Sequence, residues 1–279
     1  MPELPEVETL RRDLERVAVG RRVAEVSVTG RRTVRRQPPS EFSEALTGRR
    51  IEGARRHGKY LWAPLDDRRA LVVHLRMSGQ LLHFAPGAAA PLAEHTHAVL
   101  RLDDGAELRF VDPRTFGELF VTGDLDPTGR PRPLASLGRD PLVDGIDPSR
   151  MRRMLAGRRT SLKAFLLDQH QLAGIGNLYA DEVCFRARLR PDRRTDGLDA
   201  RQAARLSRAV TEVLSEAVAA RGSTLSDGRY LDLCGGPGGF QHRHAVYGRA
   251  GEPCPRCGMP VERSRVAGRS AHYCPSCQG

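Results

Sequence analysis

Two pairs of cysteines near the C-terminus constrain the fold of this chain more than any other feature. Cys254-Pro-Arg-Cys257 and Cys274-Pro-Ser-Cys277 are separated by 16 residues. With this spacing each pair forms a tight turn, and the two turns supply four thiolates to one tetrahedral zinc ion. The residues between the pairs are typical of two strands around a turn at 267–269, which predicts a zinc ribbon. Because four protein ligands leave no open coordination position, we expect one structural Zn²⁺ rather than a catalytic one.

The charge of the chain favours a polyanionic partner. The 279 residues carry 45 Lys and Arg against 34 Asp and Glu, a net charge of +11, and 39% of them are hydrophobic, enough for a folded core. A basic protein of this kind can neutralise phosphates and release counterions, although ordinary solubility would also explain the charge. No apolar run is long enough to span a membrane and the charged N-terminus is no signal peptide, so we expect a cytoplasmic protein.

The basic residues are almost all arginine. The sequence holds 43 arginines and only two lysines, Lys59 and Lys163. Against that background, a remaining lysine marks a place where a guanidinium is a poor substitute for an ammonium group. Both lysines are therefore candidate functional residues.

The pattern of apolar residues predicts an α+β protein of several domains. Residues 3–19 are expected to form an amphipathic helix, and short β-rich runs over 22–122 favour an antiparallel sandwich. A stretch rich in Pro and Gly follows, and from 148 the periodicity is helical. We predict a β-sandwich domain with flanking helices over 1–132, a linker over 133–147, a helical domain over 148–240 and the ribbon over 241–279.

A glycine turn separates two of the predicted helices. Gly174-Ile175-Gly176-Asn177 permits a tight turn and a close approach of the backbone, and Asn177 is a good N-cap for the helix that follows. Free amides at a helix start bind anions. In a chain of net charge +11 the turn is a candidate phosphate site.

The first residues, MPELPEVE, combine a proline with several carboxylates. If the initiator methionine is removed, Pro2 presents a secondary amine of low pKa that can attack an aldehydic carbon and form an iminium ion. Glu3 and Glu6 lie on adjacent turns of one helix face and could both approach that carbon. Glu8 points elsewhere and is expected to be solvated. Proline and glutamate are also common first-turn residues, so helix formation alone explains the cluster.

Several motifs together resemble the bacterial formamidopyrimidine-DNA glycosylase family. They are MPELPEVE, HGKYL, HLRMSG, DPRTFG, LAGIGNLYADE and the cysteine pairs, in the family's order over essentially the whole chain. The resemblance implies an N-terminal β-sandwich, a helix–two-turn–helix domain and a zinc ribbon. It also implies a bifunctional repair enzyme, acting as a monomer on double-stranded DNA. Such an enzyme flips out oxidised purines such as 8-oxoguanine or formamidopyrimidines, excises them, and cuts the strand by β,δ-elimination.

The resemblance assigns roles to the catalytic candidates. Pro2 resembles the nucleophile that attacks C1′ of the damaged nucleotide and forms a Schiff base, and Glu3 the carboxylate that transfers protons at the deoxyribose, with Glu6 supporting it. Lys59 resembles the phosphate-binding lysine near the lesion.

Other residues resemble DNA contacts of the family. Met77, Arg114 and Phe116 match the residues that fill the space left by the flipped base, where Phe116 can wedge the stack and Arg114 can bond the orphaned cytosine. Asn177 and Arg269 match phosphate contacts. Lys163 is expected on the DNA-facing surface.

The sequence departs from the family pattern in three places. Arg76 stands where glycine is frequent and Thr115 where arginine is common. The glycine-rich run CGGPGG lies where the family carries a mobile loop over the extruded base. Two alternative functions remain: an endonuclease VIII-like glycosylase for oxidised pyrimidines, against which PELPE and the Met/Arg/Phe set argue, and a non-catalytic damage-binding zinc-ribbon protein.

Overall fold

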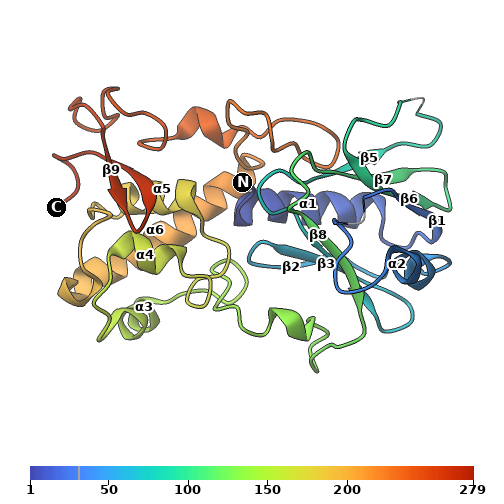
Figure 1. The fold of residues 1–279 in the computed structure, drawn as a ribbon. Helices are drawn as coiled ribbons and strands as arrows, with labels where there is room; N and C mark the ends of the chain where they lie inside the picture. The colour runs from blue at the N-terminus through green and yellow to red at the C-terminus, as the bar shows by residue number, and fades with distance from the viewer. Residues whose placement is uncertain (31, 89) are drawn as a thin grey trace. The chain divides into compact units, whose positions relative to one another are not determined.

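The computed structural model describes residues 1–30, 32–88 and 90–279 and divides into two compact units (Figure 1). The first unit combines Met1–Ser136 with Arg221–Gly239, and the second combines Leu137–Ala220 with Phe240–Gly279. Both units are therefore discontinuous in sequence.

The first unit is an antiparallel β-sandwich. One sheet has the strand order β1-β6-β7-β5 and the other β2-β3-β4-β8. The strands are β1 (Val23–Val28), β2 (Arg55–His57), β3 (Tyr60–Pro64), β4 (Ala70–His74), β5 (Gln80–Phe84), β6 (Thr96–Leu102), β7 (Glu107–Val111) and β8 (Glu118–Thr122). Leucine, valine and phenylalanine side chains from both sheets form one core. The predicted sandwich is confirmed.

Helix α1 (Leu4–Val17) packs into that core. Its residues Val7, Leu10 and Leu14 recur at three- and four-residue spacing and are buried among side chains of both sheets. In Figure 1, α1 runs between strands β5–β7 and strands β2–β3. A second helix, α2 (Pro39–Leu46), and a short 3-10 turn, η1 (Arg132–Leu134), complete this part.

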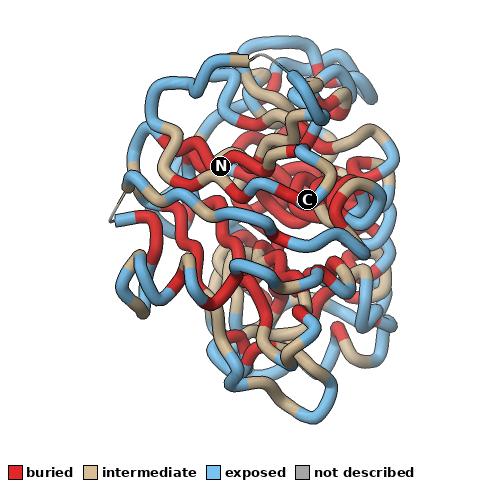
Figure 2. Tube along the Cα trace, turned by 90° about the vertical axis from the view of Figure 1, so that its right-hand side faces the viewer, coloured by how far each residue is buried: buried red, intermediate tan, exposed pale blue. Residues whose placement is uncertain are grey.

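Segment 221–239 packs with the sandwich in one compact unit, although the sequence prediction groups it with the helical domain. Tyr230 and Leu233 are buried in the sandwich core, and the amide of His83 on β5 donates to the carbonyl of Leu233 at 2.6 Å. The segment has no regular periodicity, so its attachment comes from contacts distant in sequence. Figure 2 colours the chain by burial and shows buried residues in the strands and helices and exposed residues in most of the connections.

The second unit contains four α-helices and a β-hairpin among its described residues. The elements are α3 (Pro148–Leu155), α4 (Leu162–Leu167), α5 (Asn177–Arg186), η2 (Thr195–Gly197), α6 (Ala200–Ala219), η3 (Phe240–Arg243), β9 (Glu262–Val266) and β10 (Arg269–Tyr273). The longest helix, α6, begins with a capping box between Asp199 and Gln202. Its apolar stripe, including Leu206, Val210 and Val213, is buried. The ribbon shares this compact unit with the helices.

No helix among residues 1–30, 32–88 and 90–279 combines the length and apolar character needed to cross a bilayer.

Candidate functional site

The start of α1 is a buried hydrogen-bonded junction. Pro2, Glu3 and Glu6 are all buried, and the amide of Glu3 donates to Glu6 Oε2 at 2.7 Å. The other carboxylate oxygen, Oε1, accepts from the amide of Ser223 at 2.8 Å. One carboxylate thus joins the first peptide of the helix to segment 221–239.

Gly222 makes room for that carboxylate. Its φ is +77°, and a Cβ at this position would lie 2.7 Å from Glu6 Oε1 and 2.9 Å from Glu6 Cγ. The left-handed backbone and the contact both favour a residue without a side chain. Gly238 approaches the same turn, since a Cβ there would lie 2.3 Å from the carbonyl oxygen of Gly222.

Glu8 is not solvated, contrary to the expectation from the sequence. It is buried and accepts hydrogen bonds from Arg56 Nε at 3.0 Å and Arg12 Nε at 2.9 Å, with Arg11 also in contact. These guanidinium groups keep the pKa of Glu8 below its usual value although burial alone would raise it. The sequence did not predict this burial because Arg56, which pairs with Glu8, lies on β2 and is distant in sequence.

Lys59 lies in the tight turn between β2 and β3, where His57 pairs with Tyr60. Gly58 has a φ of +59°, and its carbonyl accepts from the buried guanidinium of Arg56 at 3.0 Å. Lys59 is itself 9% exposed. Near it, burial together with the charges of Arg76 and Lys59 lowers the pKa of His74 to about 3. The neutral ring accepts the amide of Arg76 at Nδ1, at 3.0 Å.

Two loops of the sandwich are joined by a buried serine–aspartate pair. Ser78, in the β4–β5 loop, donates through Oγ to Asp112 Oδ1 at 2.5 Å. Asp112 begins the β7–β8 loop, is 0% exposed, and also accepts the amides of Arg114 at 3.2 Å and Gly117 at 2.6 Å. The Asp112 carboxylate therefore shapes the β7–β8 loop and attaches the β4–β5 loop to it.

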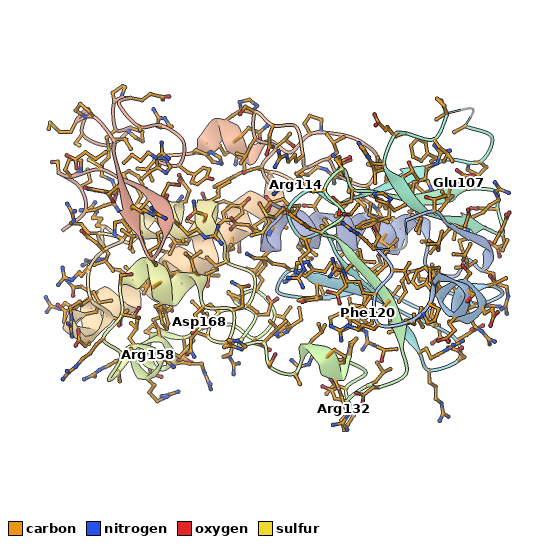
Figure 3. The ribbon with its side chains drawn as sticks, in the orientation of Figure 1. Glu107, Arg114, Phe120, Arg132, Arg158 and Asp168 are labelled. Carbon is orange, nitrogen blue, oxygen red and sulfur yellow. The ribbon has the colours of Figure 1, made fainter. Side chains whose placement is uncertain are left out.

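The loops joined in this way present the three candidate DNA-contact residues. Met77 and Phe116 are large apolar side chains that remain 38% and 43% exposed. Arg114 is exposed, and its guanidinium lies 4.7 Å from the centre of the Phe116 ring. Figure 3 labels Arg114 on this loop and Phe120 on β8, the strand that follows. An exposed cation over an exposed aromatic ring is suited to stacking against a planar group.

The two departures within these loops, Arg76 and Thr115, share one backbone conformation, which explains why glycine is frequent at position 76 but not why threonine stands at position 115. Arg76 and Thr115 have φ values of +53° and +54°, a region that glycine adopts without steric cost. Arg76 is held there by its amide bond to His74 and by a 3.2 Å contact between its guanidinium and Glu118 Oε2. Glu118 also pairs with Arg36 at 3.0 Å.

In the second unit, the glycine turn leads directly into α5. Gly174 has a φ of +106°, and Gln169 holds the turn by accepting the amide of Gly174 at 2.9 Å and donating to the carbonyl of Ile175 at 2.7 Å. The N-cap is Gly176 and not Asn177, which was predicted for that role. Instead the Asn177 side chain donates to Ser270 Oγ on β10 at 3.4 Å.

Lys163 is not on the surface, so the expectation that it faces DNA is wrong. Its side chain is 0% exposed, and Nζ donates to Asp181 Oδ1 at 2.6 Å and to the carbonyl of Ser270. The other oxygen of Asp181 accepts the amide of His272 at 2.9 Å. The buried Lys163 cation has Asp181 as its anionic partner. Because both residues also bond the backbone of β10, they hold this strand of the ribbon against α4 and α5.

The four predicted cysteine ligands come together. Their sulfur atoms all lie within 4.8 Å of one another, with Cys254–Cys277 at 3.9 Å and Cys257–Cys274 at 3.4 Å. A tetrahedral zinc ion with Zn–S bonds of about 2.3 Å needs sulfurs roughly 3.8 Å apart. The donor set therefore fits one structural Zn²⁺, and four thiolates leave no position for a substrate.

The tip of the ribbon is basic. Val266 pairs with Arg269, so the turn consists of Ala267 and Gly268, both with positive φ, and Arg269 opens β10 instead of lying in the turn. Arg269 is exposed. Beside it, a surface pocket is lined by Arg263, Ser264, Arg265, Gly268 and Ser270.

Sequence reasoning missed the residues that hold the site together. Asp112 and Ser78 belong to the motifs DPRTFG and HLRMSG, but the sequence indicates no role for them. Gly222 and Ser223 lie in a segment that was predicted to belong to the helical domain. Of these four residues only Asp112 has a local sequence signal, because an aspartate that begins a loop often accepts the backbone amides of that loop. The other contacts join residues far apart in the chain.

Comparisons with known proteins give a consistent picture. The formamidopyrimidine-DNA glycosylase N-terminal domain matches residues 1–119, the H2TH domain of the same family 137–228, and the zinc finger found in FPG and IleRS 251–279. A formamidopyrimidine-DNA glycosylase of Salinispora arenicola is 47% identical over 282 residues, covering 100% of this chain and 96% of that protein.

Solved structures of high similarity cover the whole chain. The MutM (Fpg) protein of Thermus thermophilus superposes with a TM-score of 0.86 at 44% identity, covering 100% of this chain and 99% of the other. Lactococcus lactis Fpg in complex with abasic-site DNA gives a TM-score of 0.89 at 34% identity, with 99% of each chain covered. The same enzyme with Fapy-dG DNA gives 0.87 at 33% identity, also with 99% of each chain covered.

Proposed function

This chain belongs to the formamidopyrimidine-DNA glycosylase family, and from that premise we propose that its N-terminal Pro2 is the nucleophile of the reaction. The protein is a DNA glycosylase for oxidised purines that also acts as an AP lyase. Its partner is double-stranded DNA that contains a damaged or abasic nucleotide, and its zinc ion is structural. The observation that carries the assignment is the buried carboxylate of Glu6, which fixes the peptide next to Pro2.

The chemistry of Pro2 begins after Met1 is removed. The lone pair of the secondary amine forms a bond to C1′ of the flipped nucleotide, and the base leaves with the electron pair of the glycosidic bond. Opening of the sugar at O4′ gives an iminium ion, whose positive charge acidifies the C2′ proton. Loss of that proton expels the 3′ phosphate, and a second elimination expels the 5′ phosphate. Glu3 is the proposed carrier of protons at the sugar, and Lys59 holds the adjacent phosphate.

The remaining candidates act on the DNA around the lesion. Met77 and Phe116 fill the space that the flipped base leaves, and Arg114 hydrogen-bonds the orphaned cytosine. The exposure of all three and the stacking of Arg114 on Phe116 support this role. Asn177 and Arg269 bind backbone phosphates. Lys163 contributes only by holding the ribbon in place.

Borohydride reduction tests the nucleophile, because it traps a Schiff base as a covalent protein–DNA adduct. Wild type should be trapped on a duplex with 8-oxoguanine opposite cytosine, whereas Pro2→Gly should be trapped much less. A permanent N-terminal tag should abolish trapping. Glu15→Gln serves as the control, since Glu15 lies on the same helix with a half-exposed side chain. Equal trapping of Pro2→Gly and wild type contradicts the assignment.

Two further assays separate this function from its alternatives. Faster excision of thymine glycol than of 8-oxoguanine would indicate an endonuclease VIII-like preference. Tight binding to abasic DNA without any cleavage would indicate a damage-binding protein.

We further propose that the protein works in the cytoplasm, as a monomer on nucleoid DNA. The net charge of +11 supports this placement. A fluorescent fusion at the C-terminus, which leaves the N-terminal amine free, should coincide with the stained nucleoid. Diffuse signal that ignores the nucleoid contradicts the proposal.

A further inference from the structure

An arginine just after α6 bridges two buried carboxylates. Arg221 Nη2 lies 2.6 Å from Asp13 Oδ2 on α1 and 2.7 Å from Asp232 Oδ2, and Arg221 Nε donates to Asp232 Oδ2 at 3.0 Å. The side chains of Asp13 and Asp232 are 1% and 8% exposed. The guanidinium therefore attaches segment 221–239 to α1 at its first residue.

The backbone at this residue is held in a costly conformation. Arg221 has a φ of +61°, a left-handed conformation that is sterically unfavourable for a residue with a side chain. The hydroxyl of Tyr230 donates to the carbonyl of Arg221 at 3.1 Å. Asp232 in turn accepts the amides of Cys234 at 3.0 Å and Gly236 at 2.8 Å. The bridge thus determines where the next two residues, Gly222 and Ser223, lie.

Those two residues contact the carboxylate at the start of α1. Gly222 leaves the space that Glu6 occupies, and the amide of Ser223 donates to Glu6 Oε1. Glu6 Oε2 accepts the amide of Glu3, which belongs to the same peptide plane as the carbonyl of Pro2. A continuous path of short contacts therefore runs from Arg221 to the Pro2–Glu3 peptide.

We propose that Arg221, fixed by Asp13 and Asp232, is a positioning residue for the N-terminal amine. Arg221 fixes the backbone of Gly222 and Ser223, which contact Glu6. Glu6 in turn orients the peptide between Pro2 and Glu3, and Pro2 carries the amine. The inference rests on the proposed role of Pro2. In this role Arg221 contacts neither the DNA nor the reacting atoms.

A rate measured on fully folded protein distinguishes this role from simple stabilisation. Removing the guanidinium leaves two buried carboxylates without this cation, so a loss of stability is expected whichever role Arg221 has. Asp13 keeps its contact with Arg16, and Asp232 keeps the amides of Cys234 and Gly236. A misplaced nucleophile, in contrast, can slow a reaction by one to two orders of magnitude. The rate of bond formation, measured where every variant is fully folded, therefore reports positioning separately from stability.

The test is single-turnover borohydride trapping on a duplex with a preformed abasic site, with enzyme in saturating excess. Arg221→Gln and Asp232→Asn should trap roughly tenfold more slowly than wild type, at a temperature where circular dichroism shows every variant fully folded, and with abasic-DNA affinity close to the control. Arg221→Lys should recover part of the rate. The control is Arg101→Gln, because Arg101 also bridges two carboxylates, Glu25 at 2.7 Å and Glu107 at 3.2 Å, away from the start of α1 and with more exposed partners.

A double-mutant cycle tests the path through Glu6. If Arg221 acts through Glu6, the variant Arg221→Gln/Glu6→Gln should be no slower than Glu6→Gln alone. Trapping of Arg221→Gln at the wild-type rate, a loss matched by Arg101→Gln, or additive losses in the cycle would each overturn the proposal. If wild type itself forms no adduct, it is the assignment of Pro2 that fails, so the two failures are distinguishable.

Discussion

At the scale of single residues, Gly222 should tolerate no side chain. In Gly222→Ala the new Cβ would meet Glu6 Oε1 at 2.7 Å in a left-handed backbone. We expect a loss of about 1–3 kcal/mol in the free energy of unfolding together with slower trapping on abasic DNA. Gly228→Ala is the control, since Gly228 also has a positive φ, +62°, but nothing within 4 Å of its Cβ position. Equal losses in the two variants would mean that contact with Glu6 is unimportant.

Lys163 should matter for stability and not for binding phosphate. Lys163→Met leaves Asp181 buried without its cation, which typically costs about 3–5 kcal/mol; urea unfolding measures this loss. A second measurement, the slope of log DNA affinity against log salt concentration, tests whether Lys163 binds a phosphate. The slope should stay unchanged, whereas removal of a surface phosphate contact would lower it by about one.

His74 should make the sandwich sensitive to acid. Burial lowers its pKa to about 3 in the folded protein, while the unfolded chain titrates near 6.5. Between these values the unfolded state binds more protons, so stability is full above pH ~6.5 and falls by up to about 1.4 kcal/mol per pH unit as the pH drops toward 3. Urea unfolding at pH 6.5 and 5 should therefore show a smaller loss for His74→Gln than for wild type. His95→Gln, an exposed histidine, should behave like wild type.

At the scale of elements, Asp112 should determine the arrangement of the two loops that carry Met77, Arg114 and Phe116. Asp112→Ala leaves the hydroxyl of Ser78 and the amides of Arg114 and Gly117 without their acceptor, at a cost of about 1–3 kcal/mol. Excision should lose its preference for cytosine opposite the lesion, as measured on duplexes with cytosine or adenine at that position.

Asp126→Ala is the matched control for Asp112→Ala, because Asp126 shapes an exposed turn of the same unit by accepting the amides of Thr128 and Arg130. A preference that is unchanged in Asp112→Ala, or equally reduced in Asp126→Ala, contradicts the prediction.

Elements whose signal is local could be predicted from the sequence. The three- and four-residue spacing in α1, the alternating runs of the sandwich and the paired cysteines each specify structure within a few residues of themselves. The N-cap of α5 lies one residue before the predicted Asn177, because Gly176 takes the extended backbone conformation of an N-cap. The burial of Lys163 and Glu8 and the attachment of segment 221–239 depend on partners far along the chain. No pattern within the segments themselves reports such partners.

At the scale of the whole molecule, the ribbon should depend on its metal. Its buried core is small, comprising Phe185, Val246, Val261 and two of the cysteines, so the zinc–thiolate bonds supply much of its folding free energy. Chelation, or Cys257→Ser, should release about one zinc ion per chain and abolish DNA binding. Cys234→Ser should retain the metal, since Cys234 is exposed and outside the cluster. A chelated protein that still binds DNA normally would contradict a structural role.

The discontinuous sandwich sets an order of events during synthesis. The ribosome completes Met1–Ser136 early, but the last part of that unit, Arg221–Gly239, follows only after all the residues of α3 to α6 have been made. Until then Glu6 lacks the amide of Ser223 and the turn at Gly222. The nascent chain therefore passes most of its translation with an unfinished N-terminal junction. The peptide beside Pro2 therefore reaches its final hydrogen bonding only after residue 223 has been synthesised, late in a chain of 279 residues.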